Sequence, residues 1–248
     1  MLINHYDFPI TNVSVILDEQ ATKVNIVQGV KDLLRDAKPG DVLVFTNSSH
    51  GTSIADIDGD EHDGPPDIMY DEAICPYDSG PNKLLIDDEL RHIINKLPQD
   101  VHLTVISDSC CSGSITRLTP LPDDDRTARL VDSELFGYRS LRGFLMDDKI
   151  EEIGEVRSRN REKYPESAMK EILLSGCEDI EVSYDARFGN IYHGAMTYCA
   201  LQVIRDANYS LTYKELHDSL TKLIKQKRYP QHPQLEGTDA NKQRQIFT

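Results

Sequence analysis

Two short stretches of the sequence combine groups that could do chemistry with a glycine. The first, "TNSSHG", ends in His50 and Gly51, and the second, "DSCCSG", carries the adjacent thiols Cys110 and Cys111. A cysteine nucleophile needs an imidazole close by, which takes up the thiol proton and later protonates a leaving amine. Backbone N–H groups in a glycine turn beside the thiol can stabilise an oxyanion. These residue types indicate cysteine-dependent acyl transfer, with either cysteine as the nucleophile.

Both stretches follow segments that are typical of buried strands. The segment "DVLVFTNSS" precedes His50, and "HLTVISDS" precedes the two thiols. Reactive groups gather at the carboxyl ends of strands in a parallel sheet. If the two strands are neighbours, we therefore expect the imidazole and the thiols to lie side by side.

The rest of the chain alternates strand and helix patterns. Residues 12–17 and "KEILLSGC" indicate strands, and an acidic, glycine-rich loop is expected at about residues 55–81. Amphipathic periodicity predicts helices in "TKVNIVQGVKDLLRDA", "DDELRHIINKL", "HGAMTYCALQVIRDA" and "TYKELHDSLTKLIKQKR". This alternation predicts an α/β fold with a mostly parallel sheet that is flanked by helices.

The composition narrows the classes of partner. With a net charge of -15, the chain lacks the basic excess that binds nucleic acid, whereas it would attract basic substrates. No apolar run approaches the roughly 18 residues that would cross a bilayer. The start, "MLINHYDFPI", does not look like a secretory signal, and the five cysteines form no disulfide framework. We therefore expect a cytoplasmic protein without a membrane or nucleic-acid partner.

The motifs resemble those of a known family. "SSHG" and "DSCCSG" are similar to the paired motifs of the metacaspases and their bacterial relatives, the orthocaspases, which are caspase-like cysteine peptidases. The resemblance extends over nearly the whole chain, through "DIDGDEHDGPPDIMYDEAICPYD", "LIDDELRHIINKLP", "ILLSGCEDIEVSYDA", "HGAMTYCALQVI" and "QHPQLEG". It implies a caspase-like fold and a cysteine endopeptidase, classed as a hydrolase and a thiol protease.

The resemblance also assigns roles to the catalytic residues. The family nucleophile stands two residues after an aspartate, which is the position of Cys110, whereas Cys111 falls where many relatives carry histidine. His50 becomes the general acid and base, and backbone N–H groups at Gly51 and Cys110 become the oxyanion site.

Substrate preference follows from the same resemblance. Metacaspase-like enzymes cleave after Arg or Lys, so the substrates would be proteins or peptides with Arg or Lys at the cleavage site. A cation needs an acidic pocket, and Asp108 matches a family pocket position, with Asp185 in "SYDA" as a second candidate.

We expect that no cofactor is required, and we keep calcium as an optional ligand. Residues 56–63 are acidic but do not have the spacing of an EF-hand. Asp71, Asp87 and Asp88 match three acids that bind calcium in some metacaspases, whereas Arg117 stands in the place of a fourth. An arginine there should weaken calcium binding.

The resemblance also suggests how the chain is organised. Residues 1–118 match a large-subunit-like catalytic region, 119–167 form a charged connector rich in Arg, and 168–248 match a small-subunit-like region of the same domain. The family's usual N-terminal strand and helix have no counterpart in the sequence given. The connector is a candidate for autoprocessing. The alternative to a peptidase is a catalytically silent caspase-like module that binds or regulates a partner.

Overall fold

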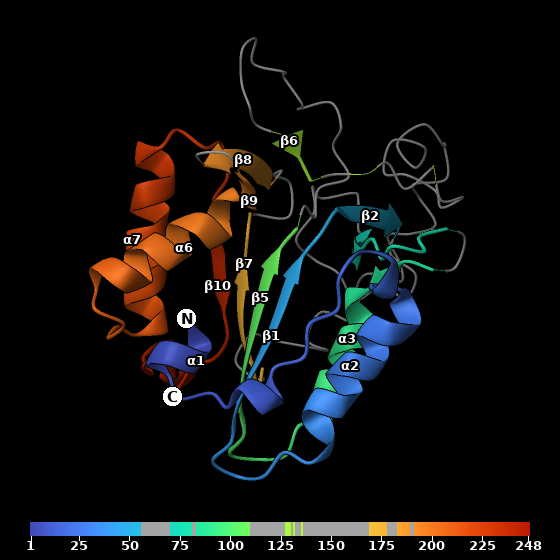
Figure 1. Ribbon diagram of the computed structural model, residues 1–248, viewed down its shortest axis with the longest axis horizontal. Coiled ribbons are helices and arrows are strands. Elements are labelled where there is room, and N and C mark those ends of the chain that lie inside the picture. The colour runs from blue at the N-terminus through green and yellow to red at the C-terminus, as the bar shows by residue number, and fades with distance from the viewer. Residues whose placement is uncertain are drawn as a thin grey trace, which may run out of the picture.

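A four-stranded sheet forms the centre of the molecule (Figure 1). The computed structural model describes residues 1–55, 70–80, 83–109, 127–129, 131, 135, 169–177, 183–188 and 191–248. Strands β1 (Val42–Ser48), β5 (His102–Asp108) and β7 (Ile172–Ser175) run parallel, and β10 (Gln234–Glu236) pairs antiparallel with β7. The order β1-β5-β7-β10 makes the two strands that carry the motifs direct neighbours, which is the condition under which the sequence brings the ends of the two strands together.

Helices cover both faces of this sheet, which confirms the predicted fold class. Helices α2 (Lys23–Arg35) and α3 (Asp87–Ile94) lie on one face, and α6 (Ala195–Asp206) and α7 (Tyr213–Gln226) lie on the other (Figure 1). Alternate residues of β5 serve the two layers: Leu103 and Val105 pack against α2 and α3, whereas Ile106 packs with α6 and α7. Burial on both faces explains why these strands are almost continuously apolar.

The helices begin and pack as their sequences dictate. The Thr22 side chain accepts a hydrogen bond from the Asn25 backbone N–H at the start of α2, and Thr212 and Glu215 form a capping box at the start of α7. Such a cap stabilises a helix by about 1 kcal/mol.

In α7, Leu216, Leu220 and Ile224 recur every four residues and are buried. Each such side chain contributes about 1.5–3 kcal/mol by leaving water.

Two small antiparallel sheets stand beside the central one. The first contains β2 (Gly51–Ala55), β3 (Tyr70–Ile74) and β4 (Leu85–Ile86), and the second contains β6 (Thr127–Ala128), β8 (Tyr184–Phe188) and β9 (Ile191–Gly194). The prediction of a loop at 55–81 was therefore wrong for β3. The strands β8 and β9 were not predicted either, because short strands with polar residues carry no periodic signal of their own.

The strand predicted at residues 12–17 does not form. The 3-10 helix η1 (Ile10–Asn12) occupies its beginning, a second 3-10 helix, η2 (Asp18–Gln20), follows, and Val15 and Leu17 between them are 65% and 63% exposed. β-branched residues favour an extended backbone, but a strand also needs a neighbour with which to pair. The prediction failed because it rested on residue type alone.

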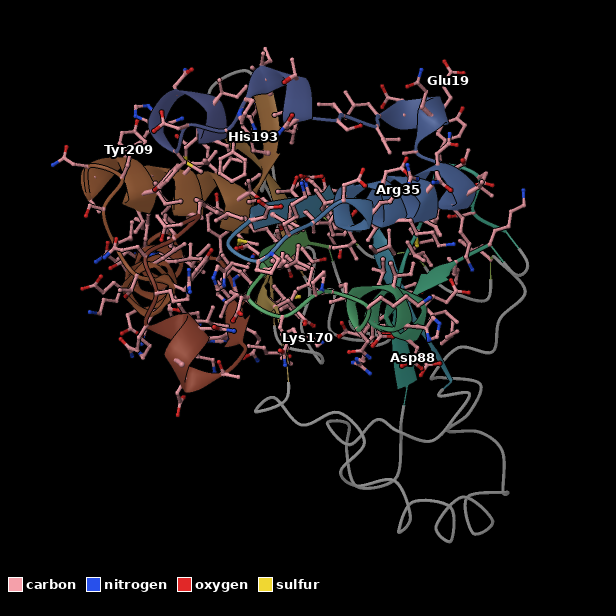
Figure 2. All side chains as sticks on the ribbon, turned by 90° about the horizontal axis from the view of Figure 1, so that it is seen from below. Glu19, Arg35, Asp88, Lys170, His193 and Tyr209 are labelled. Carbon is pink, nitrogen blue, oxygen red and sulfur yellow. The ribbon has the colours of Figure 1, made fainter. Side chains whose placement is uncertain are left out.

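The two ends of the chain lie close together (Figure 1). Helix α1 (Leu2–His5) places the His5 ring on the Tyr209 ring with centroids 3.5 Å apart, and Tyr6 meets Phe247 near the end of the chain, which follows α8 (Asp239–Lys242). Figure 2 shows His193 and Tyr209 on the α6 side of the molecule and Arg35 and Asp88 on the α2 and α3 side. Among the described helices, none is long and apolar enough to cross a membrane.

Candidate active site

The carboxyl ends of β1 and β5 meet at one edge of the sheet. Ser48, the last residue of β1, pairs in register with Asp108, the last residue of β5. His50 is exposed two residues after Ser48, and Gly51 begins β2 directly after it. Cys110 and Cys111 lie outside the described residues. The edge of the sheet that the sequence assigned to chemistry therefore carries His50, Gly51 and Asp108 together.

Asp108 is a fully buried carboxylate with a complete set of donors. Its exposed fraction is 0%, and its Oδ1 accepts a hydrogen bond from Ser183 Oγ at 2.7 Å. Its Oδ2 accepts from the backbone N–H of Thr197 at 2.9 Å and from Thr197 Oγ1 at 2.7 Å. Thr197 lies in the first turn of α6, where the helix dipole favours a negative charge. These contacts give both oxygens of the carboxylate hydrogen-bond donors where the side chain is shielded from solvent.

Glycine makes room for this carboxylate. A Cβ atom placed on Gly194 would overlap Asp108 Oδ2 and would lie 2.6 Å from Asp108 Cγ. The backbone between β9 and α6 can approach Asp108 so closely only because residue 194 has no side chain. This approach brings the first turn of α6 within hydrogen-bond reach of the end of β5.

The guanidinium of Arg129 fills the space beside Asp108. Arg129 Nε and Nη2 donate to Asp185 Oδ1 at 3.0 and 2.6 Å, and Nη1 donates to Ser48 Oγ at 2.8 Å. Nη1 also donates to the backbone carbonyl of Asp108 and lies 3.8 Å from Asp108 Oδ1. Only 7% of Arg129 is exposed. The two acids that the sequence offered as pocket residues thus hold one arginine between them.

The backbone around Arg129 is bound as well. Thr127 and Ala128 pair antiparallel with Asp185 and Tyr184 of β8, and the Arg129 N–H donates to the Ser183 carbonyl at 3.0 Å. The Arg129 carbonyl accepts a hydrogen bond from the Gly51 N–H at 2.9 Å, and the Val131 N–H donates to the Gly51 carbonyl at 3.0 Å. Residues 127–129 and Val131 therefore contact β8 on one side and the start of β2, next to His50, on the other.

Sequence reasoning missed several residues of this pocket. Ser48, Ser183 and Thr197 had no role in the prediction, and Arg129 was one of many connector arginines. Ser48 could have been found, because it precedes His50 by two residues at the end of a predicted strand. Ser183 and Thr197 carry no such signal, since their importance depends on contacts between segments that are far apart in sequence.

The three acids proposed as calcium ligands lie in two different elements, and two of them form ion pairs with an arginine. Asp71 is buried in β3, whereas Asp87 and Asp88 begin α3 and both pair with Arg91, at 3.4 and 3.2 Å. Within the ranges that the structure describes, no group of three or more His, Cys, Asp or Glu side chains is arranged to hold a metal ion. Arg117 lies outside these ranges. A calcium ion at Asp87 and Asp88 would have to compete with the guanidinium of Arg91.

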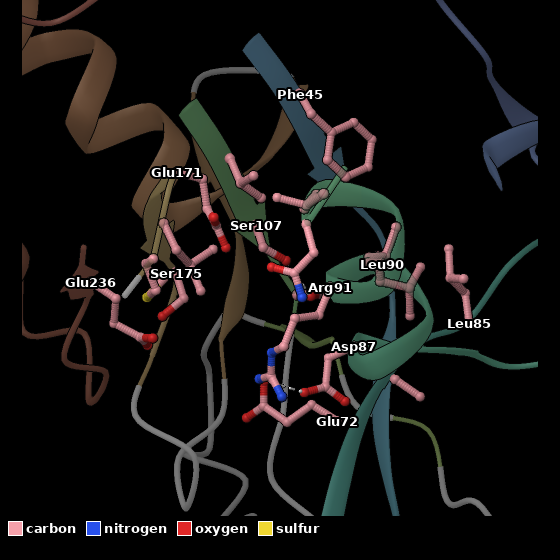
Figure 3. A pocket seen from close by; sticks show the side chains of 18 residues that line it. Phe45, Glu72, Leu85, Asp87, Leu90, Arg91, Ser107, Glu171, Ser175 and Glu236 are labelled. Atoms are coloured by element: carbon pink, nitrogen blue, oxygen red, sulfur yellow. Dashed lines mark hydrogen bonds and ion pairs between the residues drawn. The ribbon is translucent and has the colours of Figure 1, made fainter. Parts of the chain in front are cut away.

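A cavity of about 220 Å³ lies on the opposite face of the sheet, beside α3 (Figure 3). Its lining includes Phe45, Leu90, Ser107 and Ser109, and Figure 3 shows Arg91 extending toward Asp87 and Glu72, which also line it. The described residues that line it do not include His50, Asp108 or Asp185. Ser107 and Ser109 point to this cavity, while Asp108 between them points toward α6. The cavity is therefore separate from the pocket in which Asp108, Asp185 and Ser48 hold Arg129.

The sequence of the chain is similar to those of known proteins. Residues 1–119 match the family described as metacaspase, peptidase C14 domain. The chain is 32% identical to Metacaspase-1A of Aspergillus oryzae over 94% of its own length and 60% of that protein. It is 34% identical to Metacaspase-1 of Yarrowia lipolytica over 89% of its own length and 50% of that protein. The chain is thus similar in sequence to these metacaspases over most of its own length.

The chain is shorter than these relatives, and its fold is similar to that of a solved structure. The chain spans 50–60% of the length of the two relatives named above. Among solved structures, the crystal structure of protein GSU0716 from Geobacter sulfurreducens superposes with a TM-score of 0.65 at 24% identity, over 95% of this chain and 82% of that one. This likeness establishes the mixed, mostly parallel sheet flanked by helices.

Replacement of Gly194 by Ala should disturb Asp108 directly. Because the new Cβ would overlap the carboxylate, we expect a melting temperature roughly 3 to 10 °C lower than that of the unchanged protein. Gly80→Ala is the matched control, since the nearest atom to a Cβ there is 4.0 Å away. Thermal unfolding of both variants tests this, and equal melting temperatures would show that the approach at Gly194 is not tight.

Three described thiols, the buried Cys177 and Cys199 and the half-buried Cys75, should be inert in the native protein. Burial raises the pKa of Cys75 to about 12 and that of Cys199 to about 11, and Cys177 is buried with its Sγ near the Ser109 carbonyl. A raised thiol pKa leaves almost no reactive thiolate at neutral pH. We expect iodoacetamide at pH 7.5 to spare these three cysteines in the native protein and to label all five in urea. Peptide mapping by mass spectrometry gives the answer, and fast native labelling of Cys75 or Cys199 would contradict it.

Proposed function

We propose that the protein is a cysteine endopeptidase that hydrolyses peptide bonds after Arg or Lys. The observation that supports this most is the buried guanidinium of Arg129, which is held by Asp185 and Asp108 beside Gly51. The backbone carbonyl of Arg129 accepts a hydrogen bond from the Gly51 N–H, next to His50. A substrate arginine bound in the same way would present its carbonyl to the catalytic groups.

The proposed reaction uses Cys110 and His50. The Cys110 thiolate attacks the backbone carbonyl carbon of the substrate residue whose cationic side chain fills the pocket. The carbonyl oxygen takes the negative charge. The Gly51 N–H and the Cys110 N–H stabilise that oxyanion. The C–N bond then breaks, and His50 gives its proton to the leaving amine. Water, deprotonated by His50, attacks the resulting thioester, which releases the new carboxylate and restores the thiol.

The preference for cations follows from the donors and acceptors of the pocket. Asp185 Oδ1 accepts from two nitrogens of one guanidinium, and Ser48 Oγ and the Asp108 carbonyl accept from a third. A Lys ammonium is a point charge with three donors, so it can satisfy fewer of these acceptors. A neutral side chain would leave the acids without a cation. We therefore expect the order Arg, then Lys, then neutral residues.

This proposal requires no cofactor. Calcium stays an optional ligand at Asp71, Asp87 and Asp88, and Arg91 already supplies a cation to Asp87 and Asp88. The thiol chemistry fits a reducing compartment, so we place the enzyme in the cytoplasm. Its partners would be proteins or peptides with an accessible Arg or Lys.

Cys110→Ala should abolish turnover, whereas Cys111→Ala should leave a measurable fraction. Only one thiol of an adjacent pair can face both the imidazole and the oxyanion donors. The measurement is the release of aminomethylcoumarin from acetyl-Thr-Ala-Arg-aminomethylcoumarin. Equal loss in two folded variants would overturn the choice of Cys110, and no turnover by the unchanged protein would favour a catalytically silent module.

Asp185→Asn should weaken cleavage after Arg. The substitution keeps the shape of the side chain but removes the charge that faces two guanidinium nitrogens. We expect kcat/KM for the Arg substrate to fall by roughly 30-fold or more. Asp218→Asn, an exposed acid on α7 that pairs with Lys214, is the control and should change little. An unchanged Arg preference in Asp185→Asn would place the pocket charge elsewhere.

A further inference from the structure

The cavity of about 220 Å³ between α3 and the sheet has no role in the proposed peptidase reaction (Figure 3). Much of its lining is apolar. Phe45, Val105 and Leu173 line it from three neighbouring strands, and Leu90 and Ile94 line it from α3. Apolar cavities of about 150 Å³ bind benzene. This cavity therefore has room for a ring that carries a short chain.

A lysine joins the two walls of this cavity. Lys170, just before β7, donates from Nζ to the backbone carbonyls of Asn95 at 3.0 Å and Leu97 at 2.9 Å, where α3 ends. The start of β7 and the end of α3 are thus tied together before any ligand is bound, and a site formed in advance lowers the entropic cost of binding. The same contacts direct the ammonium group to α3 rather than to the neighbouring Glu171.

Carboxylates outnumber basic groups in the lining. Its acids are Glu72, Asp87, Glu171 and Glu236, and its basic residue is Arg91. The guanidinium of Arg91 already pairs with Asp87 at 3.4 Å. In a chain with a net charge of -15, the surrounding field adds to this local excess of negative charge. The cavity therefore favours a ligand with a positive charge.

Two of these acids lie on the same side of the sheet. Glu236 of β10 pairs in register with Leu173 of β7, and Glu171 precedes Leu173 by two residues, so both carboxylates project from one face. Figure 3 shows Glu171 and Glu236 on the side of the cavity opposite Leu90. Glu171 accepts a hydrogen bond from the Lys170 backbone N–H at 3.1 Å, and among the described residues no Lys, Arg or His side chain forms an ion pair with it.

We propose that this cavity binds a small organic cation, a molecule with an apolar ring or chain that fills the cavity and an ammonium group that reaches Glu171 and Glu236. The apolar part leaves water against the side chains of three strands and α3, which provides most of the affinity. The two carboxylates select the charge of the ligand, because an anion of the same shape is repelled. The proposal goes beyond the peptidase function and does not depend on it.

The site lies behind the end of β5. Ser107 and Ser109 line the cavity, and their hydroxyl oxygens are 3.0 Å apart. Asp108 between them points to the other face of the sheet, where Ser183 and Thr197 bind it. A molecule in the cavity would therefore contact the strand that carries Asp108 without entering the pocket that holds Arg129.

The first experiment compares three probes that share a phenylbutyl body and differ in charge. Binding of phenylbutylamine, phenylbutanol and phenylbutanoate to the full chain is measured by NMR titration. We expect the amine to bind roughly fivefold more tightly than the alcohol, and the carboxylate to bind most weakly. No binding of the amine, or equal affinities for the amine and the alcohol, would overturn the proposal.

The second experiment places the probes in the cavity. Glu171→Gln should weaken binding of the amine roughly fivefold and leave that of the alcohol unchanged, whereas Leu173→Phe, which puts a ring into the cavity, should weaken all three. The matched controls are Asp218→Asn, an exposed acid of α7, and Leu17→Phe, at a position that is 63% exposed, and both should bind as the unchanged protein does. Circular dichroism confirms that each variant is folded. Unchanged affinities in folded Glu171→Gln and Leu173→Phe would overturn the proposal.

A third comparison separates this site from the pocket that holds Arg129, whose acids could also attract an ammonium group. Asp185→Asn should bind the amine as the unchanged protein does. A loss of affinity in Asp185→Asn, with none in Glu171→Gln, would place the amine beside Asp185 and overturn the proposal. Because these measurements record binding alone, the result does not depend on whether the protein cleaves peptides.

Discussion

The buried carboxylate of Asp108 is the constraint on which the rest of the site depends. A charge with 0% exposure must be fully supplied with donors or cations, because the loss of water around an ion costs several kcal/mol. The donors come from Ser183, before β8, and from Thr197, in α6, while Arg129 lies nearby as a cation. The need to satisfy a single carboxylate therefore joins the end of β5 to segments that follow it by about 75 to 90 residues.

The parallel sheet determines which groups can meet at this point. Because β1 and β5 pair in register, Ser48 and Asp108 end at the same level and point to the α6 face, where Arg129 contacts both. Residues on either side of Asp108 point to the α3 face instead and line a separate cavity. The alternation of a strand thus separates the surroundings of Arg129 from the apolar cavity, although both begin within residues 107–109 at the end of β5.

The sequence was informative where a pattern is local and less so where a contact joins distant segments. The apolar runs before His50 and Asp108 predicted two buried strands but left open whether the strands are neighbours. The family resemblance identified Asp108 and Asp185 as pocket candidates. The catalytic role of Cys110 stays a prediction, since that residue lies outside the described ranges. No local pattern specifies the pairing of β8 with β9 and with β6. The place of Arg129 depends on this pairing, so the sequence could not distinguish it from the other connector arginines.

Charge compensation explains why a cation lies beside Asp108 and Asp185. The two acids are close together, and in a chain with a net charge of -15 no surrounding excess of positive charge offsets them. Arg129 provides a guanidinium from within the chain, with two nitrogens on Asp185 and a third beside Asp108. The two acids therefore have their charge compensated from within the chain. The same guanidinium joins residues 127–129 to the ends of β1 and β5, so charge compensation and the placement of this segment have one physical cause.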